Sequence, residues 1–190
     1  MIGNNSNNLY EGILNRHSVR NYTNEPISDE VLEKLMRAAM AGPCCVNARD
    51  WQFIAVRDKE VLGKMADANG RPAEALRGAA LGILVLGDLE RAFKSAPDYW
   101  VIDGSIAAQN MILAGQSLGL GSVWLGTWPQ MDRVEKQRKL FRLPDSVIPH
   151  SIIAFGYPDM EKENAKPKGE RPDGVSRGGY EPDRVHYDKW

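Results

Sequence analysis

The sequence predicts a domain of three layers, in which helices cover both faces of one sheet. Segments with apolar residues at helical spacing alternate along the chain with short apolar runs of the kind that form buried strands. Such alternation stacks helices on each side of a single sheet. The 190 residues, 43% of them hydrophobic, suffice for one domain over residues 1–190 with a substantial core.

The first half of the chain is expected to contain two helices with a strand between them. Ser28 is a good N-cap for the first helix, because its hydroxyl can accept a free amide of the first turn. Gly42 and Pro43 end that helix. A strand is predicted over residues 52–56, and the second helix over residues 59–68.

The second half is expected to supply the remaining strands and the longest helix. Asp103 can cap a helix that runs to Leu118. This helix is apolar around much of its circumference, so it should be buried on several sides. The other elements are predicted strands over residues 81–86, 122–125 and 149–155 and a helix over residues 131–141.

The charge balance argues against several classes of partner. The 24 Lys and Arg residues nearly cancel the 25 Asp and Glu residues, leaving a formal net charge of −1. A broad surface for nucleic acid or for an anionic membrane is therefore not expected. No apolar run approaches the roughly 20 residues that span a bilayer. Residues 1–8 are polar and Asn-rich, and we expect a disordered start rather than a signal peptide.

The chain is poor in side chains that perform chemistry by themselves. Its only cysteines, Cys44 and Cys45, are adjacent and cannot form a disulfide framework, which favours a cytoplasmic location. The three histidines are widely spaced, so no metal site is expected. Dinucleotide, Walker and Gly-x-Ser-x-Gly motifs are missing. This composition fits an enzyme whose cofactor supplies the chemistry.

Residues 16–22 read Arg-His-Ser-Val-Arg-Asn-Tyr and concentrate positive charge. In an extended segment Arg16, Ser18 and Arg20 point the same way, because side chains alternate with a period of two. Two guanidinium groups and a hydroxyl suit a phosphate. A solvated basic turn is the alternative interpretation.

The order of motifs along the chain resembles that of the nitroreductase family of flavoproteins. The family begins with Arg-x-Ser-x-Arg-x-Tyr/Phe and continues with a Pro-Ser-x-x-Asn-x-Gln-Pro-Trp loop. The matching segments here are residues 16–22, 43–51, 118–126, 153–158 and 184–190. The resemblance implies an α+β fold of three layers, α/β/α, with a mixed, mostly antiparallel central sheet. It also implies a homodimer that binds FMN noncovalently between its subunits and exchanges a C-terminal arm, residues 158–190.

Carried over position by position, the resemblance assigns an FMN site. Arg16, Ser18 and Arg20 would hold the phosphate and ribityl chain, with His17 along the same wall. Asn47 would hydrogen-bond the flavin ring edge from the other subunit. A backbone N–H of the strand end would reach the flavin N5 region. The remaining assigned residues are Pro43, Cys44, Cys45 and Val46 over the ring, Trp124, Leu125 and Gly126 at the strand end, and Lys168, Arg171 or Arg177 at the phosphate.

Two departures from the family pattern bear on this site. Cys44 stands where the family usually has serine, and its thiol is either a small packing group or redox-active. Arg49 and Asp50 replace the usual Gln-Pro, so the loop loses the constraint of a proline.

Three aromatic residues are candidates for substrate binding. The resemblance places Tyr99 and Trp100 near the open flavin face, and Trp128 has similar standing. Packing in the core or at a dimer interface is the alternative for each of them.

The implied activity is transfer of a hydride from NAD(P)H through FMN to a small electron-poor acceptor, such as a nitroaromatic or a quinone. Both substrates would use one flavin face, which gives ping-pong kinetics. Specialised flavoenzymes of this fold, which perform reductive dehalogenation, enoate reduction or flavin fragmentation, are one alternative. A non-enzymatic FMN-binding redox sensor is another. We expect the arm to dock Tyr187 and Trp190 on a partner surface; an unattached tail is the other possibility.

Overall fold

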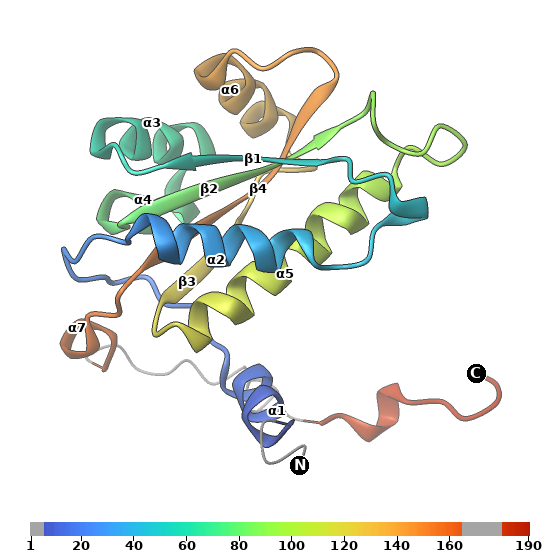
Figure 1. Ribbon diagram of the computed structural model, residues 1–190, viewed down its shortest axis with the longest axis horizontal. Coiled ribbons are helices and arrows are strands. Elements are labelled where there is room, and N and C mark those ends of the chain that lie inside the picture. The colour runs from blue at the N-terminus through green and yellow to red at the C-terminus, as the bar shows by residue number, and fades with distance from the viewer. Residues whose placement is uncertain (1–5, 165–179) are drawn as a thin grey trace.

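The computed structural model describes residues 6–164 and 180–190 (Figure 1). Its sheet contains β1 (Trp51–Val56), β2 (Leu81–Asp88), β3 (Gly121–Gly126) and β4 (Val147–Gly156) in the order β1-β2-β4-β3. All neighbouring strands pair antiparallel. The parallel contact that the described residues add is a single bridge between Ser18 and Ser122, at the outer side of β3.

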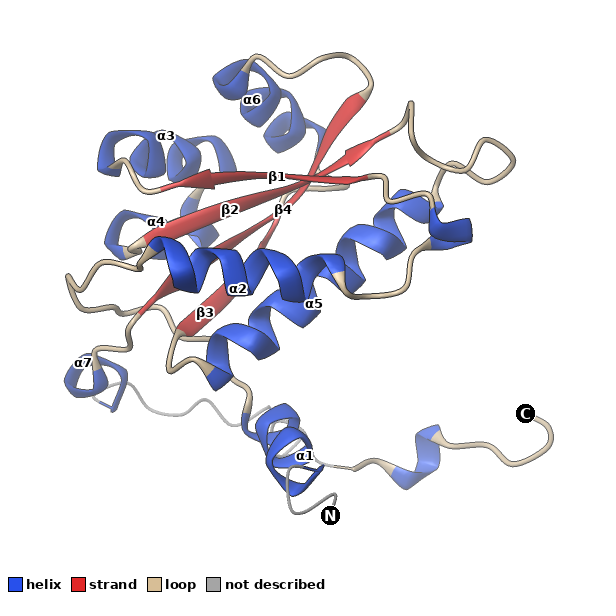
Figure 2. Cartoon of the chain, in the orientation of Figure 1, coloured by secondary structure: helices blue, strands red, loops and turns tan. Residues whose placement is uncertain are grey.

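Besides the sheet and the connecting loops, the described residues form seven α-helices and three short 3-10 turns (Figure 2). The α-helices are α1 (Ser6–Asn15), α2 (Asp29–Met40), α3 (Lys59–Asn69), α4 (Ala75–Gly78), α5 (Tyr99–Ser117), α6 (Met131–Phe141) and α7 (Met160–Asn164). The 3-10 turns are Cys45–Asn47, Arg71–Ala73 and Pro182–Arg184.

The core is divided between the two faces of the sheet, as expected for three layers. Alternate residues of β2 serve opposite faces, because side chains of a strand alternate. Ile83 packs with α2 and α5, whereas Leu84 packs with α3 and α4. Helices α2 and α5 lie together in front of the sheet in Figure 1, and α3, α4 and α6 lie on its other side. The predicted α+β architecture is therefore confirmed.

Most helices and strands lie where the local sequence signals predict them. Helix α2 begins after Ser28, whose hydroxyl accepts the amide of Val31 at 3.2 Å. Gly70 ends α3 with a φ of 77°, a conformation that glycine adopts without strain. Helix α6 has the predicted bounds, and each strand lies within two residues of its prediction at either end.

Two expectations are wrong. Helix α5 begins at Tyr99, directly after Pro97 and Asp98, so Asp103 lies inside the helix and does not cap it. The disordered start expected over residues 1–8 is wrong for residues 6–8, which belong to α1, and residues 1–5 lie outside the described residues. Helix α1 carries an exposed apolar face made of Leu9, Tyr10, Ile13 and Leu14.

The described end of the chain, residues 180–190, extends away from the sheet and its helices (Figure 1). Trp190 is 99% exposed, and its ring lies 4.1 Å from the ring of His186 between centroids. A tryptophan buries a large apolar area when it finds a surface.

Across the described residues, none of the helices combines the length and the apolar character needed to cross a membrane.

Candidate functional site

The predicted phosphate motif is attached to the outer edge of β3. The amide of Val19 donates to the carbonyl of Ser122 at 2.9 Å. Gly121 makes this approach possible, because a Cβ at that position would lie 2.6 Å from the Val19 side chain. The motif therefore extends the sheet beyond β3, along the edge of β3 that does not pair with β4.

Arg16 and His17 line a pocket of about 220 Å³ beside this edge. The pocket lies between the end of α1, the end of α5, the start of β3 and α7, and Gln116, Ser122 and the carboxylate-bearing Glu163 contribute to its wall. The Arg16 side chain is half-buried there. A guanidinium and an imidazole at one pocket provide the donors that a phosphate requires.

Ser18 and Arg20 are arranged differently from the expected three-residue cluster. They are absent from the described wall of that pocket, and the guanidinium of Arg20 turns back to the carbonyl of Ser18 at 3.5 Å. Beside them, the Glu163 carboxylate of α7 accepts the amides of Arg20 and Asn21 at 2.9 and 2.7 Å. It also accepts the Asn21 side chain at 2.6 Å. The structure thus brings Arg16 and His17 together and leaves Ser18 and Arg20 beside them.

The loop expected to cover the flavin ring is tied to α5. The amide of Cys45 donates to both carboxylate oxygens of Asp103, each at 3.0 Å. Pro43 and Asn47 are exposed, and Val46 is 68% exposed. Val46 has a φ of 43°, which is strained for a β-branched residue. Strained and exposed backbone of this kind is common in segments that contact ligands or partners.

Two buried carboxylates lie beneath this loop, and sequence reasoning gave neither of them a place in the site. Asp50 is 0% exposed, and neither of its carboxylate oxygens has a hydrogen-bond partner among the described residues. Burial, with the nearby Asp103 charge as a second cause, raises the pKa of Asp50 to about 6. Burial also raises the pKa of Asp103. The substitution of aspartate for the usual proline at position 50 was the available signal.

The same environment bears on the two cysteines. Burial raises the pKa of the Cys45 thiol, and the charges of Asp103 and Asp50 raise it further. A raised pKa disfavours the reactive thiolate. The Cys44 sulfur lies 4.0 Å from the side-chain oxygen of Asn47. These surroundings favour a packing role for the Cys45 thiol.

The far end of β3 presents Trp124, Leu125 and Gly126. Leu125 is buried in the core, whereas Trp124 is 36% exposed. The carbonyl of Gly126 accepts Asn69 Nδ2 at 3.0 Å and Arg133 Nη1 at 2.9 Å. Neither Asn69 nor Arg133 was found from the sequence. The contact of Asn69 joins residues 57 positions apart, whereas that of Arg133 spans seven positions.

The three candidate substrate residues have different surroundings. Trp100 is 3% exposed, packs against Gly87, and meets the ring of Trp128 edge-on at 5.2 Å. The packing alternative therefore describes Trp100, because its face is covered within its own chain. Tyr99 is exposed, and Trp128 is half-buried beside the strand end. Lys168, Arg171 and Arg177, the candidate phosphate cations, lie outside the described residues.

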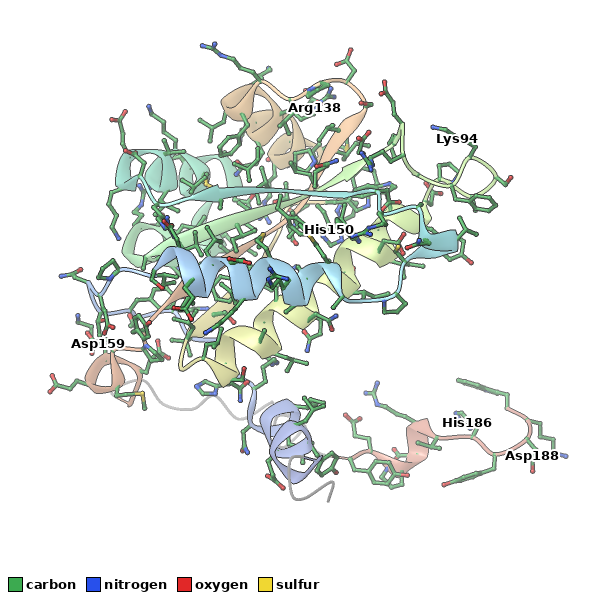
Figure 3. All side chains as sticks on the ribbon, in the orientation of Figure 1. Lys94, Arg138, His150, Asp159, His186 and Asp188 are labelled. Carbon is green, nitrogen blue, oxygen red and sulfur yellow. The ribbon has the colours of Figure 1, made fainter. Side chains whose placement is uncertain are left out.

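His150, labelled in Figure 3, is a buried histidine whose ring meets that of Trp100 edge-on at 5.8 Å between centroids. It is the extra residue of a bulge where β4 pairs with β2. Its Nε2 lies 3.1 Å from the carbonyl of Val101, and its Nδ1 lies 3.0 Å from Ser151 Oγ. Because a carbonyl only accepts, these contacts fit a neutral ring protonated on Nε2. Burial lowers the pKa of His150 to about 4. Its ring also meets Trp124 edge-on at 5.6 Å.

The fold is shared with several solved structures. A protein of Parabacteroides distasonis ATCC 8503, provisionally named an NADH dehydrogenase/NAD(P)H nitroreductase, is 37% identical with a TM-score of 0.82. The match covers 96% of this chain and 99% of that one. An FMN-dependent nitroreductase of Clostridium difficile R20291 is 27% identical with a TM-score of 0.79, covering 94% and 98% of the two chains. The fold is thus that of flavin- and NAD(P)H-linked oxidoreductases.

Sequence relatives support the same class. A Methanothermobacter thermautotrophicus protein, also provisionally named an NADH dehydrogenase/NAD(P)H nitroreductase, is 40% identical over 182 residues. That match covers 96% of this chain and 87% of the relative. The profile of the Nitroreductase family matches residues 13–85 and 69–157. The chain belongs to the nitroreductase family, and it is an enzyme, an NAD(P)H-linked oxidoreductase.

Proposed function

We propose that this chain binds FMN along the outer edge of β3 and uses it to pass a hydride from NAD(P)H to a small electron-poor acceptor. The proposal is carried by the positions of two features on β3. The pocket lined by Arg16 and His17 lies at one end of the strand, and the partly exposed Trp124 lies near the other end. Ser122 and Gly126 are about 13 Å apart along an extended strand. A phosphate at the first end and a flavin ring at the second suit an extended cofactor.

The residues of one chain fit one end of FMN. Arg16 and His17 supply donors for a phosphate, but a pocket of about 220 Å³ is smaller than the roughly 300–1,000 Å³ of typical cofactor sites. The ring end therefore needs a further cover. FMN, when bound, supplies reversible two-electron chemistry at its N5 position. The chain itself contributes the phosphate donors, the strand end and the loop over residues 43–47.

We infer that a second copy of the chain provides that cover. The apolar face of α1 and the exposed Trp190 would be poor surfaces for an isolated chain. Exchange of the C-terminal arm would bury both Tyr187 and Trp190 on the partner. Asn47, exposed on its strained loop, would then reach the partner's FMN, and Lys168, Arg171 or Arg177 would complete the phosphate site.

The acceptor in this proposal is a nitroaromatic or a quinone, and the two substrates take turns at one open face near Tyr99 and Trp128. Steady-state kinetics with NADH and a quinone test this order of events. Parallel lines in double-reciprocal plots are the expected result. Intersecting lines would exclude the ping-pong order, and no turnover with either nicotinamide would exclude the proposed activity. We also propose a cytoplasmic location, because the two adjacent cysteines cannot form a disulfide framework.

A further inference from the structure

The two halves of the motif over residues 16–22 are held in different ways. The second half is fixed to the sheet, because the amide of Val19 donates to the carbonyl of Ser122 at 2.9 Å. Arg16 and His17 precede this attachment and directly follow the end of α1. The placement of Arg16 and His17 therefore depends on how α1 is held against the rest of the chain.

Apolar packing within the chain contributes little to holding α1. Figure 1 shows this helix beyond the end of α5 and away from the sheet. Its large apolar side chains are 46–63% exposed, namely those of Leu9, Tyr10, Ile13 and Leu14. A helix whose apolar face is uncovered needs another contact to fix its direction, because burial of such a face is what normally attaches a helix to its domain.

A polar contact from α5 supplies this attachment. Gln116, in the last turn of α5, is half-buried, and its Nε2 donates to the carbonyl of Gly12 in α1 at 3.0 Å. Within the described chain, this is the hydrogen bond that joins α1 to another helix or strand. The direction of α1 is thus set at Gly12, one turn before Arg16.

The hydrogen bond from Gln116 also caps the end of α1. The last four carbonyl groups of an α-helix have no amide partner within the helix, and Gly12 carries the first of these four in α1. The amide of Arg16 would continue the helix by donating to Gly12, but it donates to the carbonyl of Ile13 at 3.4 Å instead. Gln116 therefore replaces the donor that Gly12 lacks, and the chain leaves the helix at Arg16.

His17 takes part in the same helix end. Its Nδ1 lies 3.1 Å from the carbonyl of Asn15, and because a carbonyl only accepts, Nδ1 is the donor. Gln116, Arg16 and His17 all line the pocket beside β3. The residues that end α1 are therefore also residues of the pocket wall, and a change in the direction of α1 would displace Arg16 and His17 together.

We propose that Gln116 is a positioning residue for the phosphate of the cofactor: by capping α1 from α5, it places Arg16 and His17 at the pocket. This inference rests on the proposed FMN site. Riboflavin has the same ring and ribityl chain as FMN but lacks the phosphate. Gln116 thus contributes to the preference of the protein for the phosphorylated flavin, and it leaves the binding of riboflavin unaffected.

The test compares the same substitution at two positions of α5. Gln116→Met removes the amide donor, adds no charge and keeps the length of the side chain. Gln109→Met makes the identical change two turns earlier, at an exposed position of the same helix. The dissociation constants of the full-length protein for FMN and for riboflavin are measured by quenching of flavin fluorescence. Gln116→Ala removes the same donor and replaces Gln116→Met if that variant does not fold.

We expect the unaltered protein to bind FMN more tightly than riboflavin. Gln116→Met should raise the FMN dissociation constant about threefold to tenfold, the loss typical of one hydrogen bond, and leave the riboflavin constant unchanged. Gln109→Met should change neither constant. In Gln116→Met, an equal change for both flavins, or no change for either, would overturn the inference and leave the proposed function intact. Failure of the unaltered protein to bind FMN would overturn both.

A double variant shows whether Gln116 acts through the groups that it places. In the Arg16→Ala background, Gln116→Met should weaken FMN binding less than it does in the unaltered protein, because one of the two placed donors is already gone. Such non-additivity is the mark of residues that act together. An undiminished effect in the Arg16→Ala background would contradict the positioning role of Gln116.

Discussion

Asp103 of α5 accepts the backbone N–H of Cys45 on both of its carboxylate oxygens, at 3.0 Å each. This contact joins residues 58 positions apart and ties the loop over residues 43–47 to the longest helix. Gly42 allows the close approach, because a Cβ there would lie 2.6 Å from Ile106 of the same helix. The loop that we place over the flavin ring is thus held by one buried charge.

Replacing Asp103 by asparagine should loosen this loop. A hydrogen bond to a charged group contributes about 1.5–3 kcal/mol, so we expect the Cys45 amide to exchange with solvent at least about tenfold faster in Asp103→Asn. Hydrogen exchange of the FMN-free protein measures this. Asp98→Asn is the control, since Asp98 makes no side-chain capping bond at the start of α5. Equal exchange in both variants would refute the role of Asp103.

Removing the carboxylate of Asp50 should stabilise the protein at neutral and alkaline pH. Its folded pKa of about 6 lies above the ordinary value of 3.8, so folding favours the protonated form and stability falls as pH rises from 3.8 through 6. Asp50→Asn should therefore gain about 1–2 kcal/mol at pH 8, after the cost of burying an amide. Urea unfolding at pH 8 and below pH 4 measures this. A variant less stable than the parent at pH 8 would contradict the prediction.

His150 acts in the opposite direction. Its folded pKa of about 4 lies below the ordinary 6.5, so folding favours the neutral ring. The resulting stability is complete above pH 6.5 and is lost as pH falls toward 4, by up to about 3 kcal/mol. Because Asp50 opposes this trend between pH 4 and 6, the slope should be clearest in Asp50→Asn. His150→Gln in that background should flatten it, and a slope that survives would exclude His150 as its source.

Loss of Arg16 should weaken FMN binding. Its half-buried guanidinium lines the pocket beside β3, and charge-assisted contacts to phosphate are typically about 1.5–3 kcal/mol. Arg16→Ala should raise the FMN dissociation constant by about tenfold or more, measured by quenching of flavin fluorescence. Arg37→Ala on α2, which removes an exposed ion pair with Glu33, should leave it unchanged. Equal constants for both variants would remove Arg16 from the phosphate site.

Removal of residues 183–190 tests the exchanged arm. We expect weaker dimerisation by analytical ultracentrifugation, because Tyr187 and Trp190 would no longer cover a partner. A second variant that changes only Trp190 to alanine should have a smaller effect in the same direction. If the truncated protein is as dimeric as the complete chain and binds FMN as well, residues 183–190 do not contribute to the interface.

The elements with local signals could be predicted from the sequence. Ser28 and Gly70 mark helix ends through interactions within a few residues, and the apolar run of β2 indicates a buried strand by itself. The prediction that Asp103 caps a helix was wrong, because a carboxylate near a helix start can either cap that helix or accept a backbone amide from another segment. Here Pro97 and Asp98 begin the helix earlier, and Asp103 serves the distant Cys45.

The candidate site was predictable only in part, because several of its contacts are long-range. Arg16 and His17 stood out through their charge and spacing. By contrast, Asn69 reaches Gly126 from another helix, and His150 is turned inward by a bulge in the pairing of β4 with β2. Neither relationship leaves a pattern along the chain. The exposed apolar face of α1 did have helical spacing, but the Asn-rich residues before it obscured that signal.

The most direct test of the account is a visible absorption spectrum of the purified full-length protein with FMN, taken before and after anaerobic addition of NADH. We predict flavin bands that stay with the protein through gel filtration and bleach when NADH is added. Bands that stay but do not bleach with NADH or NADPH would contradict the proposed hydride transfer. A protein that retains no flavin would contradict the FMN site along β3.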